Sequence, residues 1–241
     1  MASASNSSDC AGCRQEWGIK MEDKRAICIL ASNRMEEQGK SISYYICKMI
    51  FAVLNKKGVS CEILNLRNYT FFPCVGCGGC REGLRCGKDK EFNQIYAELC
   101  LADYVFFVSP QSIPIPAKLC MLFEKLEQLT FLQERENYID QSELCGKLAG
   151  IITYGKGDRW APEDCKIMVN DTISNILGAL GLKIVPYNSK WNTGISLTVR
   201  NIPTGNETLL VKEHDWKMME ESVRRYVEVI VQTSKSLHAI C

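Results

Sequence analysis

The sequence predicts a parallel, doubly wound α/β sheet, and two observations lead to this fold class. Short apolar runs of strand length alternate along the chain with segments whose apolar residues recur at helical spacing. Such alternation is typical of a parallel sheet with helices on both faces. A chain of 241 residues, of which 46% are hydrophobic and 24% charged, is also large enough to bury a substantial core.

Five strands and five helices are expected in alternation. The strands are expected at residues 25–31, 59–66, 103–108, 147–153 and from 183 onward. The helices are expected at residues 41–55, 92–101, 117–132, 163–180 and 215–234. In the first helix Ile42, Ile46 and Ile50 share one face, and Gly58 closes the segment.

The domain organisation follows from these elements. Residues 1–23 are polar and small and form an N-terminal tail. Residues 24–190 form the α/β domain, with a loop rich in glycine and cysteine at 67–90 after the second strand. Residues 191–241 form a C-terminal extension that carries an amphipathic helix.

Charge and cysteine usage narrow the function classes. The chain has 29 basic and 28 acidic residues, a net charge of +1, so no nucleic-acid partner and no acidic membrane surface is expected. We see no secretory signal and no apolar run of the ~18 residues that a membrane span needs. We therefore expect a cytoplasmic protein, in which the 14 cysteines stay reduced and form no disulfide framework.

The cysteine motif is the strongest chemical signal. Cys74, Cys77 and Cys80 are each separated by two residues, and Cys86 follows after five more. One tight turn can wrap three such thiolates around a cubane, and thiolates are the ligands of a [4Fe–4S] cluster. Gly76 and its glycine neighbours permit the unusual dihedral angles of such a turn. All four cysteines are predicted to hold a single cluster.

Two other interpretations of this motif stay open. Structural zinc sites usually pair two cysteine knuckles across a longer insert, which favours iron over zinc here. The loop can also hold no metal at all. The separate pair Cys10 and Cys13 is weak, and an unliganded tail pair explains it.

The first strand–helix turn is a candidate phosphate site. Ser32 follows the first strand and Ser41 begins the helix, so free backbone N–H groups and the helix dipole can lie beneath a phosphate. The charges of Arg34 and Lys40 can complete this cradle. Gly39-Lys40-Ser41 imitates a nucleotide P-loop, but Arg34 stands where that motif needs glycine, and the dinucleotide glycine pattern is absent. An ordinary capped helix remains the alternative.

With these motifs the chain resembles the iron–sulfur flavoproteins of the NADPH-dependent FMN reductase group, whose fold is flavodoxin-like. The resemblance covers residues 24–185, and the cysteine motif is its most specific part. It implies a flavodoxin-like five-stranded sheet with a cluster-binding loop after the second strand. It also implies FMN as cofactor and association into a homodimer or homotetramer.

The resemblance also implies the flavin contacts. The phosphate would be held by Ser32, Arg34, Lys40, Ser41 and Ile42. The isoalloxazine would be framed by Pro110, Gln111, Ser112, Ile113, Thr153, Tyr154, Gly155 and Gly157. The sequence departs from the group at Ala31 and Asn33, where glycine and proline are common, and at Gln111 and Ser112, where an apolar residue and a tyrosine are usual.

The expected function is electron exchange between a reduced donor and an acceptor by a flavin-dependent oxidoreductase carrying FMN and a [4Fe–4S] cluster. A ferredoxin or NAD(P)H are candidate partners. The alternative is an NAD(P)H-dependent flavin or quinone reductase whose cysteine loop is structural, and a redox-responsive binding module is a third class. No general acid or base is assigned, because the two histidines, His214 and His238, fall in or near the C-terminal helical region.

Overall fold

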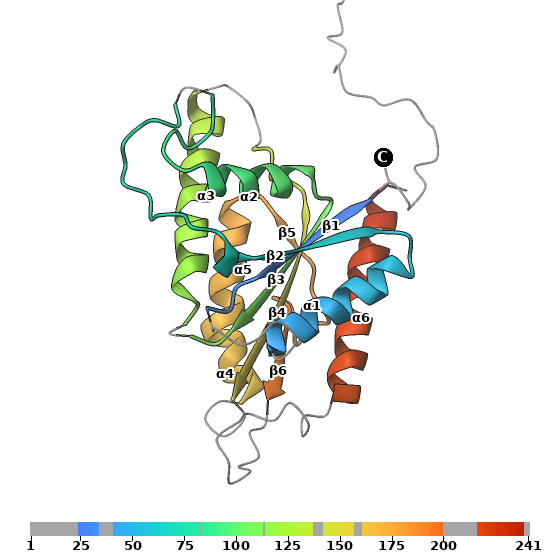
Figure 1. Cartoon of the computed structure of the whole chain (residues 1–241). Coiled ribbons are helices and arrows are strands. Elements are labelled where there is room, and N and C mark those ends of the chain that lie inside the picture. The colour runs from blue at the N-terminus through green and yellow to red at the C-terminus, as the bar shows by residue number, and fades with distance from the viewer. Residues whose placement is uncertain are drawn as a thin grey trace, which may run out of the picture.

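The computed structural model places the central part of the chain in alternating strands and helices (Figure 1). The structure describes residues 24–33, 41–81, 83–112, 114–136, 142–156, 161–199 and 216–238. Within them, no helix is both long enough and apolar enough to cross a membrane.

The strands form one parallel sheet. They are β1 (Arg25–Leu30), β2 (Ser60–Asn65), β3 (Tyr104–Pro110), β4 (Leu148–Lys156), β5 (Lys183–Ile184) and β6 (Ile195–Val199). Their order is β2-β1-β3-β4-β5, with β6 also paired to β4, and every pairing is parallel. The chain winds outward in both directions from β1, which confirms the doubly wound sheet expected from the sequence.

The sheet has six strands where the sequence analysis expected five. Leu148 and Ala149 of β4 pair with β5, and β4 residues from Ile152 onward pair with β6. One edge of β4 is taken by β3, so β5 and β6 lie in succession along the other edge. The chain leaves the sheet after Val185, whose amide donates to the Ala149 carbonyl over 2.9 Å, and it returns to the same strand position at Ile195. The sequence analysis did not find β6, because the strand is short and follows an irregular segment.

Helices cover both faces of this sheet. They are α1 (Ile42–Asn55), α2 (Lys90–Leu101), α3 (Ala117–Glu136), α4 (Pro162–Cys165), the π-helix η3 (Lys166–Asn170), α5 (Asp171–Ala179) and α6 (Trp216–His238). A 3₁₀ turn, η2 (Leu66–Asn68), follows β2. The single helix predicted at 163–180 is thus interrupted by a π-helical turn, which widens the helix where it passes β4 and β6.

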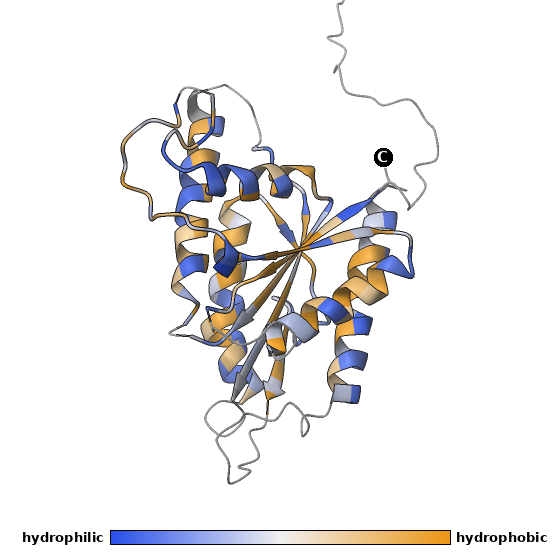
Figure 2. Ribbon diagram, viewed as in Figure 1, coloured by the Kyte–Doolittle hydropathy of each residue, from blue (hydrophilic) through white to orange (hydrophobic). Residues whose placement is uncertain are grey.

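The core has two halves, one on each face of the sheet. Ile27 and Ile29 of β1 face α2, α3 and α5, whereas Ala26 and Cys28 face α1 and α6. This alternation follows from the two-residue period of a strand, and the central strands are hydrophobic along most of their length (Figure 2). Each fully buried Ile or Leu side chain contributes about 1.5–3 kcal/mol, so the two faces together hold the sheet in place.

Gly194 gives a direct test of the way β6 enters the sheet. Its φ angle is 108°, and an added Cβ would lie 2.2 Å from the Ile151 carbonyl oxygen. We expect Gly194→Ala to lower the free energy of unfolding by about 2 kcal/mol or more, because both the backbone angle and the contact with backbone oppose it. Urea unfolding measures the change. Gly178→Ala in α5 is the matched control, since nothing lies within 4 Å of its added Cβ. Equal stability of the two variants would contradict this account of β6.

Candidate functional site

The carboxyl ends of the parallel strands bring the predicted flavin-binding segments to one edge of the sheet. Ser32 follows β1 and is buried. Pro110 ends β3, and Thr153 to Gly155 lie near the end of β4, in register with the end of β3. Those of the residues selected by the resemblance that the structure describes therefore come from neighbouring segments at a single edge.

The N-terminus of α1 lies at this edge and is not capped by its own side chain. Ser41 occupies the N-cap position without a capping side-chain hydrogen bond, and the first turn carries no acidic residue. The first intrahelical bond runs from the Tyr45 amide to the Ser41 carbonyl over 3.0 Å. The amides of residues 42–44 therefore have no partner within the helix, and together with the helix dipole they favour an anion.

A hydrogen bond ties this helix start to β4. The hydroxyl groups of Tyr154 and Ser43 lie 2.6 Å apart. Ser43 is fully buried in the first turn of α1, and Tyr154 is partly buried near the end of β4. The contact fixes the position of the α1 N-terminus relative to the strand that precedes the predicted ring-binding loop.

Gln111 is held by the helical segment that follows β4. Its backbone amide donates to the Tyr154 carbonyl over 2.9 Å. The Cys165 thiol donates to its side-chain oxygen over 3.4 Å, and its side-chain amide donates to the Met168 sulfur over 3.9 Å. At Gly155 an added Cβ would lie 2.6 Å from the Cys165 sulfur, so the two segments approach closely. The sequence analysis did not find Cys165 or Met168, since neither belongs to a motif.

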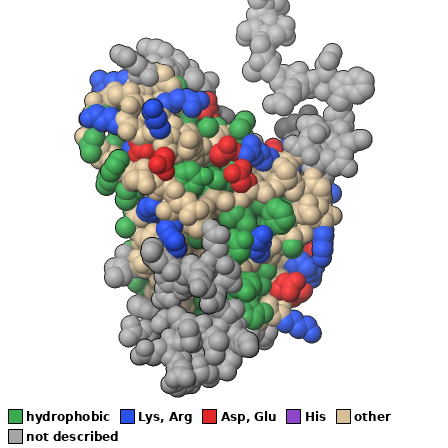
Figure 3. Space-filling model, in the orientation of Figure 1, with side chains coloured by type: hydrophobic (Ala, Val, Ile, Leu, Met, Phe, Trp, Pro, Cys, Tyr) green, Lys and Arg blue, Asp and Glu red, His purple; other side chains and the backbone are tan. Residues whose placement is uncertain are grey.

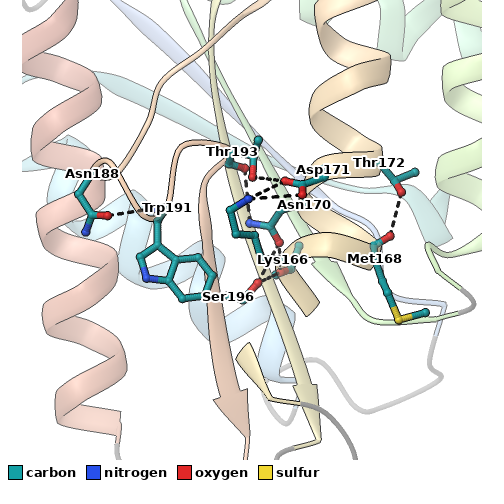
Figure 4. A network of polar contacts seen from close by, with 10 residues as sticks. Lys166, Met168, Asn170, Asp171, Thr172, Asn188, Trp191, Thr193 and Ser196 are labelled. Atoms are coloured by element: carbon teal, nitrogen blue, oxygen red, sulfur yellow. Dashed lines mark hydrogen bonds and ion pairs between the residues drawn. The ribbon is translucent and has the colours of Figure 1, made fainter. Parts of the chain in front are cut away.

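A buried polar network supports the same segment (Figure 4). The Asn170 side-chain oxygen accepts hydrogen bonds from Thr153 of β4 and from Ser196 of β6, the latter over 2.9 Å. Asp171 accepts from Thr193 over 2.6 Å and from the Lys166 ammonium over 3.0 Å. The π-helix is thereby bound to both strands, which positions Met168 and Cys165 against Gln111.

Several predicted residues lie outside the described residues. These are Arg34, Lys40, Ile113 and Gly157 of the predicted flavin site, together with Cys10, Cys13 and His214. Ser112 is described, and its amide donates to the Pro114 carbonyl over 2.9 Å.

The cysteine loop forms a second site, beside the sheet. Its four cysteines line one cavity of about 450 Å³, whose walls include Phe72, Phe92, Leu129 and Leu132. Cys77 is exposed, whereas Cys74, Cys80 and Cys86 are partly buried. Gly76 and Gly78 have φ angles of 61° and 71°, which let the loop turn sharply around this space. The structure therefore gathers the four predicted ligands.

The two ends of this loop are fastened by one carboxylate. Asp89 caps α2 by accepting from the Phe92 amide over 3.0 Å, and its second oxygen accepts from the Phe72 amide over 3.0 Å. Asp89 also pairs with the Lys125 ammonium of α3 over 3.1 Å, and the two side chains are only 3% and 6% exposed. Loop entry, loop exit and α3 thus meet at a single buried ion pair.

Further hydrogen bonds hold the cysteines themselves. The Cys74 amide donates to the Glu124 carboxylate of α3 over 3.0 Å. The Cys86 backbone exchanges two hydrogen bonds with the Asn93 side chain of α2, over 2.8 and 2.9 Å. The first and the last cysteine of the motif are therefore positioned by two different helices.

The charges at the cavity influence one another. Burial raises the pKa of the Cys80 thiol, and the neighbouring thiolates of Cys74, Cys86 and Cys77 raise it further. Burial alone would raise the pKa of Asp89, but the two backbone amides and Lys125 hold it below its usual value. Burial alone would lower the pKa of Lys125, which its carboxylate partner and the neighbouring thiol instead raise.

The part of the chain that the structure describes has no preformed site for a single metal ion. There, no three His, Cys, Asp or Glu side chains are arranged as one metal ion would need. A cubane is bound differently, because each of its irons takes a separate thiolate. Arg81 and Lys88 line the cavity and are exposed, Arg85 of the same loop is also exposed, and basic side chains gather at this end of the molecule in Figure 3.

The architecture is shared with flavin proteins of known structure. RosB, solved with 8-demethyl-8-formylriboflavin-5'-phosphate, superposes with a TM-score of 0.57 at 16% identity over 88% of this chain and 81% of its own. An NADH:FMN oxidoreductase (EMOB) gives 0.53 at 11% identity, covering 86% and 90%. A flavodoxin from Fusobacterium nucleatum gives 0.50 at 12% identity, covering 87% and 98%. These likenesses define the fold as flavodoxin-like.

The family is given by the sequence itself. Residues 25–180 match the model of the NADPH-dependent FMN reductase family, and the chain belongs to this family. It is therefore a flavin-dependent oxidoreductase, as the sequence analysis expected. No curated protein matches it.

Acid should weaken the contribution of Asp89 to stability. Its pKa lies below the ordinary value of about 3.9, so the stabilisation by its ionised form is complete above that pH and is lost as the pH falls through the lower folded-state value. We expect Asp89→Asn to lower the free energy of unfolding by about 3 kcal/mol at pH 7, because it leaves Lys125 buried without a counter-charge. The deficit should shrink at about pH 3.

Urea unfolding of both proteins at the two pH values measures this difference. The control is Glu163→Gln, which removes an exposed carboxylate that pairs with Lys190 over 2.8 Å. That change should have a much smaller effect at pH 7. A deficit for Asp89→Asn that stays constant with pH would rule out the ion pair as its cause.

Proposed function

We propose that this flavin-dependent oxidoreductase binds FMN at the carboxyl edge of the sheet and a [4Fe–4S] cluster in the cysteine loop, and exchanges electrons between a donor and an acceptor. One observation carries the proposal, namely that Cys74, Cys77, Cys80 and Cys86 line a single cavity. Thiolate ligands from one glycine-rich loop suit such a cluster, and its apolar walls would limit access of water.

The flavin phosphate would bind between the end of β1 and the start of α1. Ser32, Ser41 and the amide of Ile42 are the described residues of this cradle, and the charges of Arg34 and Lys40 would add to it. The uncapped first turn of α1 supports this placement. Gln111, Ser112, Tyr154 and Gly155 would frame the ring, since they lie at the ends of β3 and β4.

The two cofactors would supply complementary redox chemistry, because a flavin takes electrons singly or in pairs and a cluster takes one at a time. The role of the chain is to bind, position and shield them. A nicotinamide such as NADPH is the donor that the family description suggests, and a ferredoxin is a candidate one-electron partner. Association into dimers or tetramers stays a prediction.

A second candidate function is an NAD(P)H-dependent flavin or quinone reductase with a purely structural cysteine loop. The fastening of the loop by Asp89 and Lys125 favours it, because a metal-free loop held in this way can keep its shape. Metal and flavin analysis separates the two functions.

Cys77→Ser tests the cluster. Anaerobically reconstituted protein should carry about four iron atoms and four sulfides per chain, with FMN bound. Cys77→Ser should lose most of the iron and sulfide and keep the flavin, because the flavin cradle comes from other loops. Cys120→Ser is the matched control, since Cys120 is an exposed cysteine of α3 outside the cavity.

The same assays distinguish the alternatives. Flavin without iron in the parent protein would replace the proposed function with the reductase. Zinc in place of iron would make the loop a structural metal site, and the absence of both cofactors would favour a binding module.

Charge removal tests the phosphate cradle. The double variant Arg34→Ala with Lys40→Ala should weaken FMN binding tenfold or more, because a charge-assisted phosphate contact contributes about 1.5–3 kcal/mol. Fluorescence titration of the apoprotein measures the affinity. Lys56→Ala with Lys57→Ala removes the same charge at the opposite end of α1 and should leave binding nearly unchanged. Equal loss in both double variants would refute the assignment.

A further inference from the structure

Lys125 lies in an unusual place for a lysine. It belongs to α3, its side chain is only 6% exposed, and it lines the same cavity as the four cysteines. A buried ammonium is costly unless it is paired and hydrogen-bonded. Such a residue calls for an explanation beyond packing.

Its contacts point in two directions. On one side the ammonium pairs with Asp89 over 3.1 Å. On the other side it donates to the Cys86 sulfur over 3.4 Å. The ring of Phe92 lies below it, 5.2 Å away at the centroid, and excludes water from that direction. The positive charge is therefore fixed between a carboxylate and a thiol by α2, α3 and the loop.

The carboxylate of Asp89 is itself satisfied by other donors. Its two oxygens accept the amides of Phe92 and Phe72. Part of its negative charge is thus balanced without Lys125, whereas Cys86 receives the ammonium directly. The ion pair presents its positive end to the sulfur.

We propose that Lys125 is a positioning residue that raises the reduction potential of the cluster held by Cys86 and its three companion cysteines. This inference rests on the proposed function. Reduction adds one electron and hence one negative charge, and a cation that donates to a ligand sulfur stabilises that charge. No proton transfer is required, and in a titration dithionite supplies the electron.

The experiment is a redox titration of the reconstituted full chain, followed by electron paramagnetic resonance. Lys125→Met should lower the potential, with the equilibrium constant for reduction falling about tenfold, which is 59 mV for a one-electron couple. Asp89→Asn should move the potential in the opposite direction, because it leaves the ammonium beside the sulfur without its carboxylate. If Lys125 had a purely structural role, both variants would shift the reduction potential in the same direction.

Folding is controlled by a double variant. Each single change breaks a buried ion pair and destabilises the loop, whereas Lys125→Met with Asp89→Asn removes both charges and should recover part of the lost stability. Its potential should lie above that of Lys125→Met but below that of the parent, because the lost ammonium donates directly to the Cys86 sulfur and the lost carboxylate offsets only part of its effect. Lys118→Met is the matched control on the same helix, since Lys118 donates to the carbonyls of Leu66, Arg67 and Tyr69 and, among the described residues, to no cysteine.

The outcomes separate the two proposals. A parent protein that takes up no iron and sulfide overturns the proposed function and this inference with it. A parent that binds the cluster while Lys125→Met keeps the parental potential overturns the inference alone. The inference alone is also overturned if Lys125→Met and Asp89→Asn shift the reduction potential in the same direction.

Discussion

The parallel direction of every strand is the constraint on which the rest of this structure depends. Parallel pairing requires a crossover after each strand, and the crossovers place helices on both faces of the sheet. It also gathers the carboxyl ends of β1, β3 and β4 at one edge, although they are far apart in the sequence. This arrangement places the N-terminus of α1 at the same edge and brings Gly155 close to Cys165.

Much of the fold could be predicted because burial leaves a periodic pattern. The runs from Arg25 and from Asp103 read as buried strands, and the helix from Ser41 shows its apolar face. β6 was missed because it shares one strand position with β5, and a short strand after an irregular segment has little periodicity of its own. The π-helix was missed because one wider turn hardly alters the spacing of apolar residues.

The residues of the candidate sites likewise fall into those that the sequence predicted and those that only the structure revealed. The spacing of Cys74, Cys77 and Cys80 is local, so the sequence alone indicates that they share a site. Lys125 and Asp89 belong to different elements and meet only through tertiary packing. Cys165 and Met168 likewise reach Gln111 only after the helix has folded back along β4. Contacts between distant segments leave no spacing signal to read.

Because β5 and β6 share one edge of β4, the length of the chain between them can vary. Pairing of β5 with Leu148 and of β6 with Ile152 is set independently, each by its own register. The exposed residues 188–190 between them can gain or lose length without shifting either half, whereas Val185 and Gly194 are held against β4. The exposed turn at residues 188–190 is therefore a suitable point for an insertion, because a longer loop there would bring new side chains near the sheet while the hydrogen bonds of β5 and β6 stay intact.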